Sequence, residues 1–376
     1  MNKEYRPIRQ KTILILTNNI GGLHSFRKEV MKAFVDSDYK VVISSPINKG
    51  DESKAAYFDE IGCEVVNTEF NRKGTNPIKD LQLLRTYVAF IKKYKPKAVL
   101  TYTIKPNVYG GIAAARCHVP LLANVTGLGD TLENPGLMQK LNVFLYRFGL
   151  RKAHLVFFQN QENRQFFIDR NMVKSPTVLL PGSGVNLNHH TPQPYPEDTG
   201  ITKFIFISRI LKDKGVEELF ASIENIKARH QDKVELHILG NCEDNYSQQL
   251  NDLHERGIVI YHGAKPDVRP YVASSHCLIL PSYHEGMSNV LQEASAAARP
   301  VITCNVSGCK EIVEDGKSGF LCKVKDAADL EARMEAFISL PYQQKIAMGL
   351  AARQKVERDF DRTIVINKYL EEVQKL

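Results

Sequence analysis

Short apolar runs, rich in β-branched residues, alternate along the chain with longer segments whose apolar residues recur at helical spacing. Runs that are apolar at every position are typical of parallel strands covered by helices on both faces, because neither face meets water. In the first half of the chain these runs are Thr12–Thr17, Lys40–Ser44, Cys63–Val66, Ala98–Thr103, Pro120–Val125 and Leu155–Gln159. This half therefore predicts a doubly wound α/β domain.

The same alternation restarts after a turn-rich stretch, HHTPQPYPEDTG at residues 189–200. The later runs are Phe204–Ile207, Val234–Leu239, Ile258–Tyr261, Cys277–Leu280 and Val301–Cys304. A length of 376 residues is also more than one hydrophobic core usually serves. We therefore predict a first domain over residues 1–190, a second over 191–355 and a terminal helix over 356–376, with ligands in a cleft at the carboxyl ends of the strands.

Composition excludes several classes of protein. Hydrophobic residues at 43% and charged residues at 24% indicate a globular chain rather than a disordered one. No run approaches the roughly 18 apolar residues that a spanning helix needs, and the first residues, MNKEYRPIRQK, lack the apolar core of a secretory signal, so a cytoplasmic location is expected. The seven cysteines form no C-x-x-C pair and share no ligand spacing with histidines, so we expect reduced structural thiols.

Charge is distributed unevenly between the two halves. Up to His190 there are 27 Lys and Arg against 15 Asp and Glu, whereas the remainder holds 23 against 27. The basic first half is consistent with nucleic acid, an anionic membrane surface or a phosphorylated acceptor as a partner. For any one cluster a solvated helix face is the favoured interpretation, whereas for the excess over the half-chain it explains the charge only as well as an anionic partner does. No nucleic-acid recognition motif accompanies the charge.

The first candidate site follows the first apolar run, where Gly21 and Gly22 precede an amphipathic segment. Glycines at a strand-to-helix turn let the backbone approach a phosphate, and the start of a helix offers unpaired N–H groups to it. A tight turn that requires positive φ explains the pair equally well. The segment is no G-x-G-x-x-G motif, so a nicotinamide cofactor is not supported.

The second candidate site lies just beyond the run FIFIS, where Arg209 and Lys214 follow the expected carboxyl end of a strand. The planar fork of an arginine and the compact charge of a lysine suit a diphosphate whose negative charge grows as its bond breaks. A solvated helix start is the alternative interpretation of such a charge run.

The third candidate site is the stretch PSYHEGMSNVLQEASAAARP at residues 281–300. Glu285 lies in the expected loop, Ser288 and Asn289 can cap a helix, and Glu293 lies about one turn into it. Carboxylates beside a helix N-terminus suit the hydroxyls of a sugar and a ribose that flank a diphosphate. Two surface glutamates favoured by the helix dipole would give the same spacing.

Together these segments resemble a known family. Glu285 and Glu293, with seven residues between them, look like the E-x7-E motif of retaining glycosyltransferases of family 4, which have the two-domain GT-B fold. Further signatures follow in the expected order across nearly the whole chain: the glycine pair, the Arg/Lys pair, SGCKEIVEDGKSGFLC at 307–322 and FDRTIVINKYLEEVQKL at the end. The resemblance implies two Rossmann-like domains facing a cleft, with the terminal helix returning to the N-terminal domain.

The resemblance also implies transfer from a nucleotide sugar to an acceptor hydroxyl with retention of anomeric configuration. Glu285 would contact the donor sugar, Arg209 and Lys214 the leaving diphosphate, and Glu293 the ribose. The other implied donor contacts are Gly21, Gly22, Met287, Ser288 and Asn289. No metal cofactor is expected, because the two cations and a helix N-terminus could stabilise the diphosphate; the D-x-D at residues 359–361 is interpreted as a surface pair.

One segment departs from the family pattern. Many relatives have a histidine that meets the donor sugar after the strand corresponding to AVLTYT, where this chain has Tyr102, Thr103 and Lys105. These three are candidates for positioning the sugar or the acceptor, although Tyr102 could equally be a core residue of the strand. Thr126, in the glycine-rich segment VTGLGD, is a candidate for the acceptor side.

The motifs TYTxKPN, VTGLG, EFNRKGTNP and GSGVNL look most like bacterial enzymes that extend undecaprenyl-diphosphate-linked glycans, such as N-acetylgalactosaminyl and galacturonosyl transferases. This implies a UDP-linked HexNAc or uronic acid as donor, a lipid-linked acceptor, no nucleic acid, and a possible peripheral position on the cytoplasmic face of the inner membrane. The segment Leu137–Leu150 could touch that membrane, although a buried amphipathic helix explains it as well. The rival functions are a sugar-nucleotide epimerase or hydrolase of the same architecture, and a non-catalytic sugar-nucleotide-binding protein.

Overall fold

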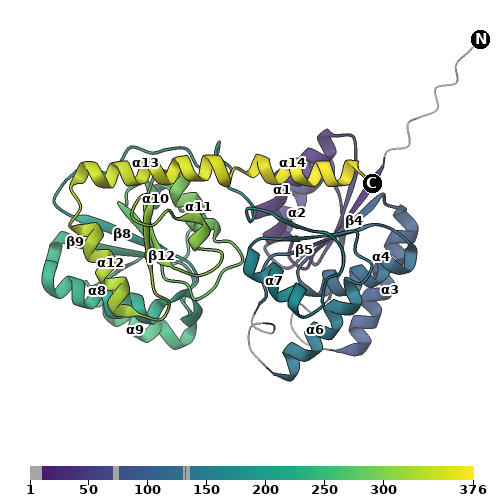
Figure 1. Ribbon diagram of the computed structural model, residues 1–376, viewed down its shortest axis with the longest axis horizontal. Helices are drawn as coiled ribbons and strands as arrows, with labels where there is room; N and C mark the ends of the chain where they lie inside the picture. Colours follow the sequence, from purple (N-terminus) through teal and green to yellow (C-terminus); the bar gives the residue numbers. More distant parts are fainter. Residues whose placement is uncertain (1–10, 71–75, 130–131, 133–135) are drawn as a thin grey trace, which may run out of the picture. The chain divides into compact units, whose positions relative to one another are not determined.

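The computed structural model describes residues 11–70, 76–129, 132 and 136–376 (Figure 1). Residues 71–75 of the EFNRKGTNP motif and Asp130 of the VTGLGD segment lie outside the described residues. By its internal contacts the chain divides into two units, one of residues 1–183 with Ile364–Leu376 and one of Gly184–Thr363. The sequence had placed the divisions after residues 190 and 355.

The first unit is built on a seven-stranded, entirely parallel sheet in the order β3-β2-β1-β4-β5-β6-β7. Its strands are β1 (Thr12–Leu16), β2 (Lys40–Ser45), β3 (Glu64–Asn67), β4 (Ala98–Tyr102), β5 (Leu121–Val125), β6 (Leu155–Phe158) and β7 (Thr177–Leu179). The predicted doubly wound domain is confirmed. β7 is the strand that the sequence missed, because it is three residues long, lies at the sheet edge and is only partly buried.

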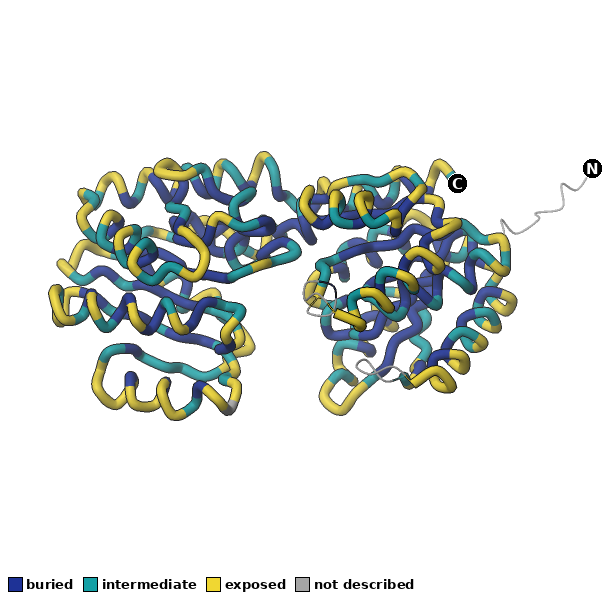
Figure 2. The backbone as a smooth tube through the Cα atoms, turned by 60° about the horizontal axis from the view of Figure 1, so that its bottom comes forward, coloured by how far each residue is buried: buried dark blue, intermediate teal, exposed yellow. Residues whose placement is uncertain are grey.

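Helices cover both faces of this sheet, as continuous apolar strands require. Ile13 and Ile15 pack on one face, with α1 (Ile20–Asp36), α2 (Glu52–Glu60) and α14 (Arg362–Gln374). Leu14 and Leu16 point to the other face, because successive side chains of a strand alternate. The elements on that face are α3 (Pro77–Tyr94), η1 (Pro106–Gly110), α4 (Gly111–Cys117), α6 (Leu137–Gly149) and α7 (Gln161–Asp169). The buried strands and the exposed outer turns of the helices are visible in Figure 2.

The terminal helix α14 belongs to the first unit, which confirms the predicted return of the chain end to the N-terminal domain. Tyr369 is fully buried, and its hydroxyl donates a hydrogen bond to Oδ1 of Asn124 on β5. The Tyr369 ring also packs against Phe157 of β6, with 4.9 Å between ring centroids. The segment that the sequence assigned to this helix starts earlier, within α13 (Tyr342–Asp359), and the two helices are separate.

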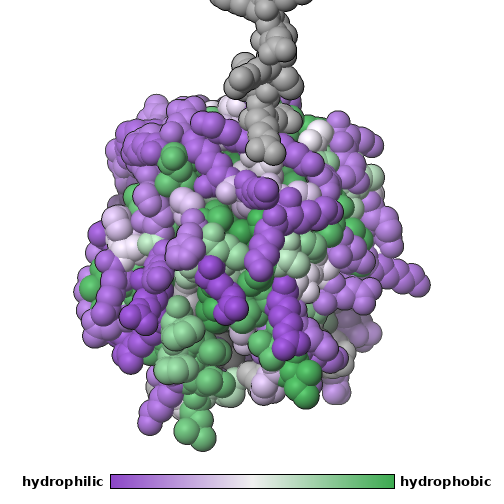
Figure 3. Space-filling view, turned by 90° about the vertical axis from the view of Figure 1, so that its right-hand side faces the viewer, coloured by the Kyte–Doolittle hydropathy of each residue, from purple (hydrophilic) through white to green (hydrophobic). Residues whose placement is uncertain are grey.

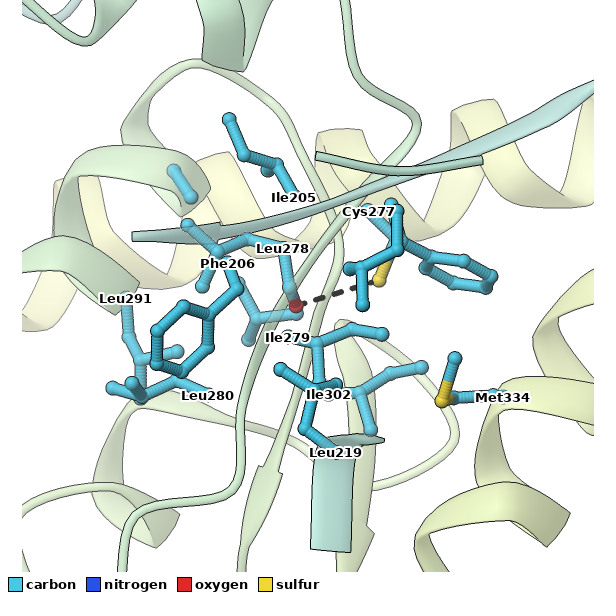
Figure 4. Packing of buried hydrophobic residues seen from close by; sticks show 14 of the residues in the cluster. Ile205, Phe206, Leu219, Cys277, Leu278, Ile279, Leu280, Leu291, Ile302 and Met334 are labelled. Atoms are coloured by element: carbon cyan, nitrogen blue, oxygen red, sulfur yellow. Dashed lines mark hydrogen bonds between the residues drawn. The ribbon is translucent and has the colours of Figure 1, made fainter. Parts of the chain in front are cut away.

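The second unit contains a six-stranded parallel sheet in the order β10-β9-β8-β11-β12-β13. Its strands are β8 (Thr202–Ile207), β9 (Val234–Leu239), β10 (Ile260–Tyr261), β11 (Cys277–Leu280), β12 (Val301–Cys304) and β13 (Gly319–Cys322). Its helices are α8 (Val216–His230), α9 (Asp244–Glu255), α10 (Arg269–Ala273), α11 (Asn289–Ala296), α12 (Ala327–Ile338) and α13. Figure 4 shows strand residues such as Ile279 and Ile302 packed with Leu219 of α8 and Met334 of α12, so a second hydrophobic core is confirmed.

Arg299 holds residues 193–194 of the turn-rich stretch in place through hydrogen bonds within the second unit. Its guanidinium is 1% exposed and donates hydrogen bonds to six backbone carbonyls, those of Gln193, Pro194, Val272, Ala273, Ala297 and Ala298. Burial lowers the pKa of Arg299 to about 10. Carbonyl dipoles therefore take the place of a carboxylate partner, and residues 193–194 are linked through Arg299 to the end of α10 and to the residues after α11.

Candidate functional site

The strand order of the second sheet reverses beside β8, because the chain builds outward through β9 and β10 and then returns to β11 on the other side. In open α/β sheets, ligands bind beyond the carboxyl ends of the strands at such a reversal. The loop that carries Arg209 and Lys214 follows β8, and the loop that carries Glu285 follows β11. The fold therefore brings two of the segments predicted from sequence to the same place.

An ion pair joins the two loops. Lys214 Nζ lies 2.5 Å from Glu285 Oε1, and both side chains are 17% exposed. Ser282 Oγ lies 3.0 Å from the same carboxylate oxygen, to which it can donate. The backbone N–H of Tyr283 donates to the carbonyl of Asp213 at 2.9 Å, so the loops are also tied through their main chains.

Two glycines, one after β8 and one after β12, allow the backbone to approach the β11 loop closely. Gly215 has φ of +70°, and a Cβ at this position would lie 2.1 Å from the carbonyl oxygen of Pro281. Gly308 has φ of +83°, and its Cβ would lie 2.4 Å from the carbonyl oxygen of Glu285. Both positions combine a left-handed backbone with contact distances that no side chain can satisfy, so the place of Glu285 depends on them.

We expect Gly215→Ala to lower both the melting temperature and the turnover of the protein. The added methyl must push the β11 loop away, and the left-handed backbone alone costs a non-glycine residue roughly 1–3 kcal/mol. Thermal unfolding followed by circular dichroism should show a loss of several degrees. Gly257→Ala is the matched control, because Gly257 also has positive φ but has open space around its Cβ position. An equal effect of both substitutions would contradict a special role for the contact with Pro281.

The helix α11 begins next to this ion pair. Ser288 occupies the N-cap position but its side chain makes no capping hydrogen bond, so the predicted capping by Ser288 is wrong. Its backbone N–H instead donates to the carbonyl of Gly308 at 2.8 Å. Asn289 Oδ1 is buried and has no partner among the described residues, while Met287 packs into the core. The first turn of α11 thus has backbone N–H groups that can donate hydrogen bonds to an anion.

Arg209 and Glu293, the other two charged donor contacts predicted in the second unit, take no part in this ion pair. Arg209 is exposed just beyond β8 and forms no hydrogen bond or ion pair with any residue that the structure describes. Glu293 lies one turn into α11 and lines a small pocket with His190, Arg269 and Val272. Burial raises the pKa of the Glu293 carboxyl to about 7, and the charge of Arg362 partly opposes the shift.

In the first unit, Gly21 and Gly22 lie inside α1 rather than in a turn before it. Neither glycine has positive φ, so the tight turn considered from the sequence is wrong. Asn19 caps the helix, and its Oδ1 accepts a hydrogen bond from the backbone N–H of Gly22 at 3.0 Å. A Cβ on Gly21 would lie 3.0 Å from Lys54 Nζ, so a cation stands beside the start of this helix.

The three candidates at the carboxyl end of β4 have different surroundings. Tyr102 is 4% exposed and packs in the core, which is the structural interpretation that the sequence left open, and burial raises the pKa of its hydroxyl. Lys105 Nζ forms an ion pair with Asp80 Oδ1 at 2.8 Å. Thr103 has φ of +74°, which is rare for a β-branched residue, and its buried hydroxyl has no partner within the described part of the chain. Such strain often marks a functional position.

Sequence reasoning missed Arg27, which is 3% exposed on the buried side of α1. Its guanidinium lies 5.9 Å from the centre of the Tyr102 ring and donates to the carbonyl of Gly182 at 3.3 Å. With its amide turned so that both ends have partners, the Gln159 side chain accepts a hydrogen bond from the Arg27 guanidinium at 3.1 Å. It also donates a hydrogen bond to the carbonyl of Thr126 at 3.1 Å. A basic residue on the apolar stripe of α1 was the signal that could have found this cluster.

The D-x-D at residues 359–361 consists of residues engaged with neighbours on the chain. Asp359 forms ion pairs with Lys355 at 3.1 Å and Arg358 at 2.7 Å. Its hydrogen bonds to these cations, chiefly to Arg358, lower the pKa of Asp359. Asp361 Oδ1 accepts a hydrogen bond from the backbone N–H of Thr363 at 3.0 Å.

Comparison with known proteins identifies the class. Residues 13–160 match the family model described as "Glycosyl transferase 4-like", and residues 201–339 match "Glycosyl transferases group 1". The structure resembles Anabaena HepE in complex with UDP and glucose, with a TM-score of 0.78, 18% identity and coverage of 98% of this chain and 100% of that one. The two parallel-sheet units thus have the fold of GT-B glycosyltransferases.

The protein is a glycosyltransferase with a glycosyl transferase 4-like domain followed by a glycosyl transferase group 1 domain, as its sequence motifs predicted. It is 24% identical to the N,N'-diacetylbacillosaminyl-diphospho-undecaprenol alpha-1,3-N-acetylgalactosaminyltransferase of Campylobacter jejuni, over 93% of this chain and 94% of that protein. It is also 25% identical to the capsular polysaccharide biosynthesis glycosyltransferase CapM of Staphylococcus aureus, over 76% of this chain and 78% of that protein.

Proposed function

We propose that this glycosyltransferase moves a HexNAc or uronic acid from a UDP-sugar to a lipid-diphosphate-linked glycan, with retention of anomeric configuration. The observation that carries the proposal is the Lys214–Glu285 ion pair beside the start of α11, at the carboxyl ends of β8 and β11. The similarity over nearly the full length to a transferase that acts on a diphospho-undecaprenol-linked sugar supports the choice of acceptor.

The site supplies positive charge where the reaction creates negative charge. As the bond between the donor sugar and the diphosphate breaks, charge accumulates on the leaving diphosphate, and fixed cations lower the energy of that state. Lys214 and Arg209 provide side-chain cations, and the first turn of α11, from Asn289 onward, provides backbone donors. Met287 and Ser288 lead into this turn, although the N–H of Ser288 is taken by the carbonyl of Gly308. Glu285 accepts hydrogen bonds from hydroxyls of the donor sugar, so donor binding exchanges its ion pair for contacts with the substrate.

The remaining roles follow from position. Glu293, farther along α11, accepts hydrogen bonds from the ribose of the nucleotide. We propose that the reaction needs no divalent metal, because the cations and the helix start act on the diphosphate directly. In the first unit, Gly21 and Gly22 at the start of α1, beside the charge of Lys54, are a separate candidate site for a phosphate of the donor.

The first unit takes the acceptor in this proposal. Thr103 and Thr126 follow neighbouring strands, β4 and β5, at their carboxyl ends, and Lys105 is held close by. None of the helices in the described ranges is long and apolar enough to cross a bilayer. The excess of basic residues before residue 190 suits a peripheral position on the cytoplasmic face of the inner membrane, where a lipid diphosphate is presented.

Transfer of label tests the proposal. Purified protein is incubated with labelled UDP-GalNAc, UDP-GlcNAc or UDP-galacturonate, EDTA and detergent-dissolved host lipid, and the organic phase is counted. Label in the lipid fraction is the expected result and identifies the donor. Nucleotide release without labelled lipid would instead indicate a hydrolase or epimerase, and donor binding without release would indicate a non-catalytic binder; either result overturns the proposal.

A further inference from the structure

The helix α6 exposes its apolar face to solvent. Leu137, Leu141, Phe144 and Phe148 recur at helical spacing, and they are 84%, 39%, 62% and 55% exposed. The face that α6 turns to the protein carries Asn142, Tyr146 and Gly149. The more hydrophobic side of this helix therefore faces away from the core, and the buried helix considered from the sequence is wrong.

This apolar surface is large for a single helix. Figure 3 shows hydrophobic side chains standing out at the lower end of the first unit, the end at which Figure 1 draws the beginning of α6. Contiguous exposed apolar surface on a globular protein usually marks a site of interaction with another molecule. We refer to Leu137, Leu141, Phe144 and Phe148 as the α6 stripe.

A basic pocket lies at the carboxyl end of the same helix. Arg147, Arg151 and Lys174 line it together with Asn171 and Met172, and its volume is about 340 Å³. Arg147 is held in place through Nε, which donates to the carbonyl of Arg170 at 2.8 Å, so the outer nitrogens of its guanidinium remain available to a ligand. None of the three cations forms an ion pair with an acidic side chain among the described residues.

The charge pattern indicates which partner covers the α6 stripe. Residues 137–149 include Lys140 and Arg147 but no acidic residue, and the pocket adds two further cations beyond the helix end. An apolar stripe bordered by cations that have no acidic partner among the described residues is complementary to a bilayer surface, where acyl chains lie beneath anionic phosphates. A protein partner would need to match apolar groups and anions in the same arrangement.

We propose that α6 docks on an anionic lipid bilayer, with the α6 stripe inserted among the acyl chains and a lipid phosphate held in the pocket of Arg147, Arg151 and Lys174. The inference deepens the proposed function, because docking by the first unit brings the acceptor-binding part to the surface where lipid-linked glycans reside. In this proposal the ligand of the three cations is the phosphate of a lipid headgroup. It is a different ligand from the diphosphate of the donor.

Vesicle sedimentation tests this docking without any donor or glycan acceptor, so its failure is distinguishable from failure of sugar transfer. The protein is mixed with phosphatidylcholine vesicles or with vesicles that also contain phosphatidylglycerol, at low and high salt. We expect binding to the anionic vesicles, weakened by salt because the phosphate contacts are screened. Phe144→Gln with Phe148→Gln should reduce the partition coefficient about tenfold or more, since two aromatic rings no longer leave water.

Matched variants separate the two parts of the surface. Leu350→Gln with Ile364→Gln removes two exposed apolar residues elsewhere, and it should bind vesicles as the unchanged protein does. Replacing Arg147, Arg151 and Lys174 by Gln should remove the preference for phosphatidylglycerol, whereas replacing the exposed Lys49, Lys233 and Lys317 removes equal charge and should keep it. Unchanged melting temperatures verify that each variant is folded.

Three outcomes would overturn the proposal. The first is absence of binding to anionic vesicles by the unchanged protein, and the second is equal binding by the Phe144 and Phe148 variant. The third is a dimer that the same variant converts to a monomer in sedimentation velocity, which would make α6 an interface between two copies. Equal binding to both vesicle types would overturn the phosphate pocket in particular.

Discussion

Lys214→Ala should lower kcat by about 10²- to 10³-fold, the loss that follows removal of one group that stabilises charge in a transition state. Lys214 is the cation in contact with Glu285, and the two side chains are largely buried, so water screens this charge less than it screens an exposed lysine. Because the charge on the diphosphate grows as the bond breaks, the loss should fall mainly on kcat and less on the donor KM. Steady-state kinetics with the labelled donor measure both values.

The neighbouring Lys212→Ala is the control for Lys214. Lys212 is 63% exposed and lies 3.4 Å from Glu217, on the same short turn but away from Glu285. Its loss should change kcat less than twofold. Nearly unchanged turnover in Lys214→Ala, with the unfolding transition intact, would refute the assigned role in diphosphate departure.

Glu293→Gln should raise the donor KM about tenfold at pH 8 and leave kcat nearly unchanged, because a neutral amide replaces the carboxylate that we propose binds the ribose. Binding that is equally strong in the ground state and the transition state affects KM alone. Isothermal titration with UDP-GalNAc measures the affinity directly. A normal affinity at pH 8 would contradict the ribose role.

The pH dependence gives the same residue a second test. The pKa of Glu293 is raised to about 7, so the carboxyl of the free protein is protonated below that pH and ionised above it. If the donor binds the ionised form, its affinity rises as pH increases toward 7 and levels off above it. The diphosphate of an intact UDP-sugar loses no proton in this range, so the change belongs to the protein. Glu293→Gln should bind equally at pH 6 and pH 8; a retained slope would assign the titration to another group.

The fold followed from the sequence because its strands are apolar at every position. Such runs as Ile13–Leu16 and Cys277–Leu280 are covered on both faces, and a parallel sheet between two layers of helices hides all their side chains. The start of α1 was harder to predict. Glycines are poor helix formers, so the sequence placed the helix start after Gly22, whereas the cap at Asn19 begins the helix at Ile20.

Part of the candidate site could be predicted and part could not. Lys214 and Glu285 follow strands beside the reversal of the sheet, so their loops had to meet. The cluster around Arg27 depends on packing between α1, β4 and the segment after β6, which no local pattern reveals. The outward face of α6 was equally hidden, because an apolar stripe at helical spacing normally faces the core, whereas that of α6 is exposed.

The most direct test of the account is the anomeric configuration of the linkage formed by purified protein in EDTA, determined by NMR on the lipid-linked product. Charge stabilisation by Lys214, Arg209 and the start of α11 predicts product without added metal, and retention predicts an α linkage from an α-linked UDP-sugar. A β linkage, or transfer that appears only when Mg²⁺ or Mn²⁺ is restored, would contradict it.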